Sequence, residues 1–379
     1  MLRITSTCGA SDASAGDGLS FMHDRPAGWR RLRGYAACAA VAAGLALLGP
    51  TRAGSVGGVE PDAAFEPVLS QLAELPRMRS LLVSVDGSLL VEEYFNGARA
   101  NRAANLKSAS KSIISLLVGI AVDRGHLAVD DTVDRFFPDL VDDPAKRGIT
   151  VEDLLTMRSG LETTSNRNYG RWVASRHWVR HVLTRPLVAE PGTRMIYSTG
   201  NTHLLSAIVA EASGMNTWRF AQRYLGEPMG ISVPRWTTDP QGVYFGGNEM
   251  SMLPRDMLAI GEMYLECGRV GVRQIVSEDW VHTSIVAHAT RTRSPDRAYG
   301  YGWWVRELAG YDAFYAWGYG GQFIYVVPDL RLVTVMTSSP NPGRTLREHR
   351  RSLYSLMEDE IVPAAAARRR SSPAAVGAG

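Results

Sequence analysis

Residues 106–125 have the sequence LKSASKSIISLLVGIAVDRG. Apolar side chains recur in it with the i, i+3, i+4, i+7 spacing of a helix that buries one face. Gly125 stands where such a helix would end. We therefore predict a long core helix over residues 106–122. The side chains that set the spacing are Ile113, Leu116, Leu117 and Ile120.

Ser108 and Lys111 stand three residues apart at the start of this helix. The backbone N–H groups of a first helical turn are unpaired, and the helix dipole is positive there. Side chains at i and i+3 share a face, with Cβ atoms about 5–6 Å apart. A serine hydroxyl is a weak nucleophile, but a desolvated lysine can be neutral and accept its proton. The S-x-x-K spacing therefore indicates Ser108 as a nucleophile and Lys111 as its base.

The same spacing also fits an ordinary helix with a solvated lysine. The chain contains 30 serines, so the pattern alone is only suggestive. Its placement strengthens the interpretation, because Lys111 precedes an almost wholly apolar segment and lysine is rarely buried without a function or a partner.

Two further segments carry groups that this chemistry needs. The first is YSTGN at residues 197–201, where the phenol of Tyr197 could relay a proton to the leaving group. The second is WGYGGQ at residues 317–322, whose glycines allow close approach of a substrate. The N–H groups of Gln322 and Ser108 could together form an oxyanion hole. The alternatives are a core tyrosine before a turn and a glycine-rich hairpin.

The three motifs occur in the order and at the spacing of the serine β-lactamase, DD-peptidase and class C-like esterase superfamily, which this chain resembles. Residues 106–112 resemble its S-x-x-K helix, residues 197–199 its Y-x-N element, and Tyr319-Gly320-Gly321 its K-T-G element. The similarity covers roughly residues 62–362. The branch it resembles most contains 6-aminohexanoate-dimer hydrolase and related esterases, by PRD at 254–256, YGWW at 301–304 and GGQ at 320–322.

The resemblance implies an α/β fold of the α+β type. Strand patterns open and close the chain, and Asp86-Gly87 predicts a hairpin turn in the first pair. Helical patterns fill the middle of the chain. They include residues 150–157, capped by Thr150 with Asp153, and residues 172–183. We expect one antiparallel sheet built from both ends, flanked by helices, with an all-helical lobe inserted. The expected function is hydrolysis of a small ester or linear amide through an acyl-enzyme. The alternatives are a β-lactamase, a DD-peptidase-like enzyme or a catalytically weak penicillin-binding-like module.

The chain departs from the family pattern at two positions. Thr199 replaces the Asn of Y-x-N, so the amide that orients the lysine is missing, and Asn201 is a candidate replacement. Tyr319 replaces the cation of K-T-G, which in the lactamase and peptidase branches pairs with a substrate carboxylate. A loop arginine, Arg291 or Arg293, could supply the lost charge.

Composition narrows the partners. The net charge of +3 gives no reason to expect nucleic acid or an anionic membrane. His177 and His181 have i, i+4 spacing, but Trp178 excludes the H-E-x-x-H pattern of zinc proteases, and two surface histidines explain the pair equally well. We expect no metal and no cofactor. Cys267 is expected to be a buried structural residue.

The two ends of the chain have different compositions from the middle. Residues 1–53 carry an arginine cluster and then an alanine-rich apolar run, the order of a signal sequence. This predicts export to the periplasm or outside the cell, with an uncleaved anchor as the alternative and no stable membrane insertion after cleavage. We assign residues 54–363 to the catalytic domain and expect residues 364–379 to be a disordered tail.

Overall fold

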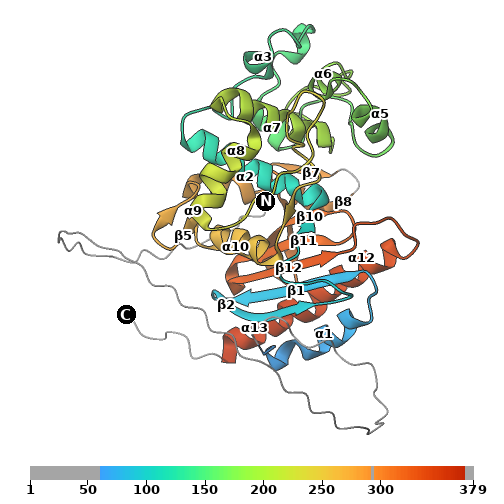
Figure 1. Ribbon diagram of the computed structural model, residues 1–379, viewed down its shortest axis with the longest axis vertical. Coiled ribbons are helices and arrows are strands. Elements are labelled where there is room, and N and C mark those ends of the chain that lie inside the picture. The colour runs from blue at the N-terminus through green and yellow to red at the C-terminus, as the bar shows by residue number, and fades with distance from the viewer. Residues whose placement is uncertain (1–59, 292–293, 372–379) are drawn as a thin grey trace, which may run out of the picture. The chain divides into compact units, whose positions relative to one another are not determined.

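The computed structural model describes residues 60–291 and 294–371 (Figure 1). The leader expected at residues 1–53 lies outside the described residues. Within the described ranges, no helix is long and apolar enough to cross a bilayer.

One antiparallel sheet joins both ends of the chain (Figure 1). Its strand order is β2-β1-β12-β11-β10-β9-β8-β7. The amino-terminal hairpin β1–β2 thus pairs, through β1, with the last strand, and the expected α+β architecture is confirmed. The strands are β1 Met78–Val85, β2 Ser88–Tyr94, β7 Ala289–Arg291, β8 Ser294–Tyr299, β9 Trp304–Leu308, β10 Tyr311–Gly318, β11 Gln322–Val327 and β12 Leu332–Ser338.

The β1–β2 hairpin turns at Asp86-Gly87, as the sequence predicts. Both residues have positive φ, 50° and 72°. Two such residues in succession match a type I′ turn, whose twist suits a two-residue hairpin. Two short strand pairs lie outside the large sheet: β3 Ala104–Asn105 with β4 Ser251–Met252, and β5 Arg269–Val270 with β6 Arg273–Gln274.

Helices cover both faces of the sheet. Helices from the two chain ends share one face: α1 Glu66–Ala73, α12 Leu346–Ser355, the π-helical turn Leu356–Ile361 and α13 Val362–Ser371 (Figure 1). The other face packs against the core cluster that includes α2 Ser110–Asp123, α10 Pro254–Leu265 and α11 Glu278–Ile285. This second face is the one that meets the Lys111 helix.

The carboxy-terminal segment differs from our expectation. We predicted disorder from residue 364, but α13 continues to Ser371. Its Ala365 is fully buried among the apolar side chains of α1 and the sheet, and Arg368 forms an ion pair with Asp62. Alanine is a strong helix former, and burial of its face outweighs the polar composition. Residues 372–379 lie outside the described residues.

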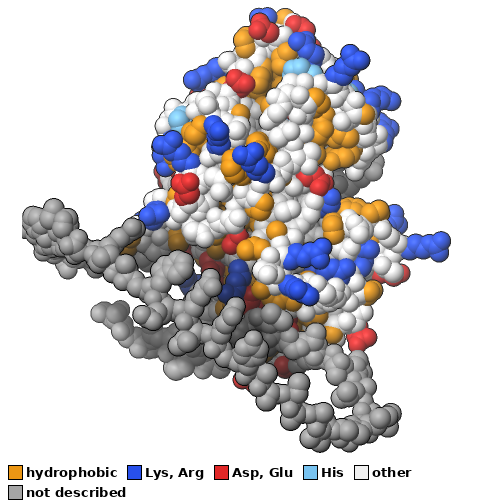
Figure 2. Space-filling model, viewed as in Figure 1, with side chains coloured by type: hydrophobic (Ala, Val, Ile, Leu, Met, Phe, Trp, Pro, Cys, Tyr) orange, Lys and Arg blue, Asp and Glu red, His pale blue; other side chains and the backbone are white. Residues whose placement is uncertain are grey.

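The inserted lobe is helical, as expected (Figure 1), and Lys and Arg side chains are spread over the face of it that Figure 2 shows. The capping box predicted at Thr150 and Asp153 is present at the start of α4. The single helix predicted over residues 172–183 is instead two, because the side chain of His177 caps α6 through the N–H of Arg180. The helices of the lobe are α3 Val133–Phe136, α4 Val151–Leu155, α5 Tyr169–Val173, α6 Trp178–Leu183, α7 Thr199–Ser213, α8 Thr217–Ala221 and α9 Glu227–Met229.

Candidate active site

Ser108 lies in a tight turn rather than in the long helix itself. Residues Lys107–Ala109 form a 3-10 turn that leads directly into α2, which begins at Ser110. Lys107 has φ of 50°, a left-handed conformation that is costly for a residue with a side chain. The sharp change of direction at Lys107 presents Ser108, which is half-buried, at the start of α2.

Lys111 is buried beside this serine, with 1% of its surface exposed. Its Nζ lies 3.3 Å from Ser108 Oγ and 2.7 Å from the carbonyl oxygen of Gly247. Burial lowers the pKa of Lys111 from 10.5 to about 7, because a charged ammonium is poorly solvated there. A large share of the lysine is therefore neutral at neutral pH, the form that can accept a proton.

Tyr197 lies next to Lys111. Its ring centroid lies 5.2 Å from Lys111 Nζ. The ring stacks on Trp304 at 5.7 Å and meets Tyr299 edge to face at 6.1 Å. These aromatic contacts hold the phenol against the lysine, and they explain the YGWW segment as a wall of the site.

Sequence reasoning missed the segment that supplies the second partner of Lys111. A Cβ at Gly246 would lie 1.9 Å from the carbonyl oxygen of Thr202, and one at Gly247 would lie 2.4 Å from Thr202 Oγ1 and 2.7 Å from Thr199 Cγ2. Only glycine lets this chain pass so close to α7. The available signal was the Gly-Gly pair, but nothing near it in sequence pointed to Lys111.

Gly246→Ala should displace this segment and with it the Gly247 carbonyl. The added Cβ would lie 1.9 Å from a backbone oxygen, and no side-chain rotation can relieve that clash. We therefore expect a loss of roughly 1–3 kcal/mol of stability and a lower rate of hydrolysis. Gly148→Ala is the control, since a Cβ there meets nothing within 4 Å. Equal melting temperatures and rates for the two variants would contradict this account.

A second set of contacts ties the same segment to the Ser108 turn. Lys107 Nζ lies 2.7 Å from Glu249 Oε1, and Asn105 Nδ2 donates to Glu249 Oε2 at 2.7 Å. Glu249 also has positive φ, 63°. The N–H of Met250 donates to Ser110 Oγ at 3.3 Å. Two strained residues thus face each other across an ion pair, which holds the turn before α2 in place.

Thr199 and Asn201, the two residues discussed for the second motif, lie in the first turn of α7. Asn201 is fully buried, and its Oδ1 accepts a hydrogen bond from Ser159 at 3.2 Å. Thr199 Oγ1 lies 2.9 Å from Ser165 Oγ. Lys111 Nζ donates hydrogen bonds to Ser108 Oγ and to the carbonyl oxygen of Gly247. The Gly247 carbonyl therefore contacts the lysine where we had expected the amide of Asn201.

The third motif forms the β10–β11 turn beside Ser108. A Cβ at Gly318 would lie 2.0 Å from the Leu106 carbonyl oxygen, so the turn packs directly on the serine loop. Gln322 is fully buried, and its amide bonds both the O and the N–H of Ser338, at 2.7 Å and 3.3 Å. Gly321, with φ of 107°, leaves room for Ser338 and Leu353.

Tyr319 projects from this turn and is 42% exposed. In sequence it takes the place of the cation expected from the K-T-G element, and a phenol brings no positive charge. The side chains of Arg291 and Arg293 lie outside what the structure describes. Arg350 is a different source of charge, with its guanidinium 6.0 Å from the ring of Trp317, two residues before Tyr319.

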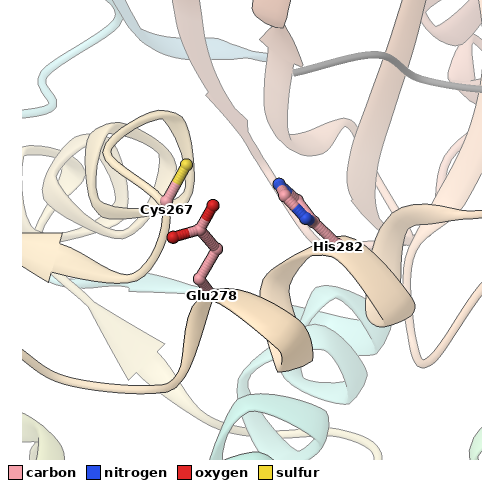
Figure 3. A group of neighbouring side chains, drawn as sticks. All are labelled: Cys267, Glu278 and His282. Carbon is pink, nitrogen blue, oxygen red and sulfur yellow. The ribbon is translucent and has the colours of Figure 1, made fainter. Parts of the chain in front are cut away.

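Cys267, Glu278 and His282 form another cluster, between the end of α10 and α11 (Figure 3). Their ligand atoms lie within 4.8 Å of one another. Cys267 is buried, as expected. Three ligand-type side chains in proximity do not by themselves make a metal site, and we assign no role to this cluster. His177, which caps α6, does not belong to it.

The chain belongs to the beta-lactamase family, whose model matches residues 73–356. This family membership makes the protein a serine hydrolase of the β-lactamase type, as the motifs indicated.

Particular relatives agree with this. A 6-aminohexanoate-dimer hydrolase of Paenarthrobacter ureafaciens is 25% identical over 305 residues, 73% of this chain and 76% of that protein. A Bacillus anthracis protein assigned as the same hydrolase has the same fold, with a TM-score of 0.68 and 19% identity over 79% of this chain and 82% of that one. EstCE1, a hydrolase with promiscuous acyltransferase activity, has a TM-score of 0.63 and 18% identity over 77% of this chain and 97% of its own.

Proposed function

We propose that this protein hydrolyses a small carboxylic ester or linear amide through an acyl-enzyme on Ser108, with Lys111 as general base and Tyr197 as proton relay. The observation that carries the proposal is the buried Lys111, with a pKa of about 7 and its Nζ 3.3 Å from Ser108 Oγ. A buried lysine without a carboxylate partner is costly, and it is typical of a site that needs a neutral amine.

The reaction follows from these positions. Ser108 Oγ attacks the carbonyl carbon while its proton passes to Lys111 Nζ. The N–H groups of Ser108 and Gln322 stabilise the oxyanion that forms, and the fixed side chain of Gln322 supports this role. The proton then moves by way of Tyr197 to the leaving oxygen or nitrogen as its bond to carbon breaks. Water attacks the acyl-serine in the second half, with the same groups in reverse.

The direct test is covalent labelling. A fluorophosphonate probe should label the protein on Ser108, and peptide mass spectrometry identifies the modified residue. Turnover of short p-nitrophenyl esters on the same preparation separates an enzyme from a module that only becomes acylated. Labelling of another serine, or of none, would contradict the proposal.

Tyr197→Phe should lower kcat by about 10²-fold or more, the usual scale for a lost acid–base group. The substitution removes only the hydroxyl, and the ring contacts with Trp304 and Tyr299 remain. A matched control is Tyr169→Phe, which removes a hydroxyl that accepts from Asn248. An unchanged kcat in Tyr197→Phe would return this residue to a packing role.

Tyr319 supports esters over β-lactams as substrates. Penicillins and D-Ala-D-Ala peptides carry a carboxylate beside the scissile bond. Loss of a charge-assisted hydrogen bond of roughly 1.5–3 kcal/mol should weaken such substrates by about one to two orders of magnitude. Tyr319 can donate only a neutral hydrogen bond, and Arg350 is exposed and screened by solvent.

We therefore expect kcat/KM to be higher for a short p-nitrophenyl ester than for a chromogenic cephalosporin. Both are measured on one preparation. A cephalosporin preferred by about tenfold or more, roughly 1.4 kcal/mol in the opposite direction, would place this protein with the β-lactamases.

Export remains part of the proposal, carried by the arginine cluster and apolar run of residues 1–53. Cell fractionation of the full chain tests it.

A further inference from the structure

A cavity of about 450 Å³ opens at the end of the sheet where β1 begins and β12 ends. Three arginines line it, Arg79 from β1 and Arg99 and Arg102 from the loop that leads to the Ser108 turn. We call this cavity the arginine pocket. The pocket is also lined by residues that offer hydrogen-bonding groups, among them Asn96, Asn105, Ser339 and Asn341.

Among residues 60–291 and 294–371, no carboxylate neutralises the charge of this pocket. No carboxylate lines it, and no described carboxylate forms an ion pair with any of the three arginines. Carboxylates that touch its walls are already engaged. Glu92, which accepts from Tyr94, pairs with Arg255, and Glu249, which accepts from Asn105, pairs with Lys107.

Two further basic residues, Arg77 and His349, lie close to the pocket. Arg77 lies behind the wall, and its guanidinium donates to the carbonyl oxygen of Ser339 at 2.9 Å. His349 bonds Ser338 Oγ at 2.8 Å, and burial, reinforced by Arg77 and Arg79, lowers its pKa to about 4, so it is neutral at physiological pH. Burial and the charges of Arg77 and Arg102 likewise lower the pKa of Arg79. These guanidinium groups repel one another, so an anion bound between them would relieve the repulsion.

The pocket adjoins the candidate active site. Asn105, in its wall, precedes Ser108 by three residues, which bounds their Cα separation at about 11 Å. On the other side, a Cβ on Gly320 would lie 2.8 Å from the Ser339 carbonyl oxygen and 3.0 Å from Pro340 Cα, so the wall also touches the β10–β11 turn. One wall of the pocket thus belongs to the same stretch of chain as Ser108, and the other touches the turn beside it, which places the pocket close to a ligand bound at Ser108.

We propose that the arginine pocket binds an oxyanion group, a carboxylate or a phosphate, at the far end of a substrate whose ester or amide bond lies at Ser108. Arginine forks suit both groups because they donate paired N–H bonds to two oxygens. This inference rests on the proposed function for the position of the scissile bond, but binding in the pocket can be measured without turnover. The remote anion differs from the carboxylate of a β-lactam, which lies beside the scissile bond.

The first experiment measures binding by calorimetry, with glutarate and inorganic phosphate as separate probes and the neutral diamide of glutarate as the matched compound. We expect at least one anion to bind and the diamide not to bind. Arg99→Gln/Arg102→Gln should weaken the anion about tenfold or more. Both side chains are exposed, so the fold should tolerate the change. Arg180→Gln, an exposed arginine on α6 outside the pocket, is the control.

Binding that is absent in the wild type, or equal in the double variant and the control, overturns the proposal. A preference for phosphate over glutarate, or the reverse, identifies which oxyanion the pocket selects. Because the contacts are solvent-accessible, the affinity should also fall with added salt.

The second experiment measures kcat/KM for p-nitrophenyl monoesters of dicarboxylic acids of increasing length, relative to neutral acyl esters of the same length. The ratio of the two kcat/KM values, monoester over neutral ester, should peak at one chain length in the wild type. At that length it should fall about tenfold in the double variant and stay unchanged in Arg180→Gln. Turnover of neutral esters with no such peak overturns the inference and leaves the proposed function standing. Absence of any turnover counts against the proposed function, and the calorimetry then decides the pocket alone.

Discussion

Ser108→Ala is expected to abolish ester hydrolysis while the protein stays folded. Without the Oγ no acyl-enzyme can form, and the oxyanion hole and binding alone leave only residual catalysis. Loss of a nucleophile in comparable serine hydrolases lowers kcat by roughly 10⁶-fold. The side chain is half-buried in a turn held by backbone and by the Lys107–Glu249 ion pair, so its removal leaves the framework intact.

The measurement is kcat/KM for a short p-nitrophenyl ester, with the melting temperature recorded alongside. Ser110→Ala is the matched control. Ser110 is the first residue of α2, and its Oγ donates to the Lys107 carbonyl oxygen at 2.6 Å. We expect that variant to lose some stability but to retain turnover and probe labelling. A Ser108→Ala protein that keeps most of its activity, with no other serine labelled, would rule out Ser108 as the nucleophile.

Lys111→Arg is expected to be nearly as damaging. Arginine stays protonated, so it can supply charge but cannot accept the serine proton. It must also fit a site that is 1% exposed, where Nζ already bonds Gly247 and Ser108. Retention of most of the rate in Lys111→Arg would leave Lys111 only an electrostatic role.

The pH profile gives an independent check on Lys111. Burial lowers its pKa to about 7, and the proposed base is the neutral form, so activity should be lost as pH falls through about 7 and be present above it. The measurement is kcat/KM of the wild type for a neutral ester across this range, since that ratio reports the free enzyme. A rate independent of pH there would show that protonation of the lysine does not limit the reaction.

Local pattern was sufficient for much of the framework. The period of the apolar residues after Lys111 predicted α2, Asp86-Gly87 predicted the first hairpin, and Thr150 with Asp153 predicted the cap of α4. Each signal lies within a few residues of the structure it specifies. Of the two errors, one has a local cause and the other does not. The side chain of His177 starts a new helix within the predicted segment 172–183. Ala365 and Ala366 are buried in a core cluster that includes Phe65 and α1, about 300 residues earlier in the chain.

The sequence by itself determined the candidates for the chemistry: the Ser108 and Lys111 pair at helical spacing, and two later motifs at family spacing. It also indicated the sheet with its inserted helical lobe, because alternation and helical periodicity are encoded in neighbouring residues. Only the tertiary structure decided what surrounds Lys111. The Gly247 carbonyl, the Trp304 wall and the arginine pocket join segments far apart in the chain, and close approach of backbones at Gly246 and Gly318 leaves no periodic trace in sequence. Burial of that lysine, which sets its pKa, is a property of the whole packed core.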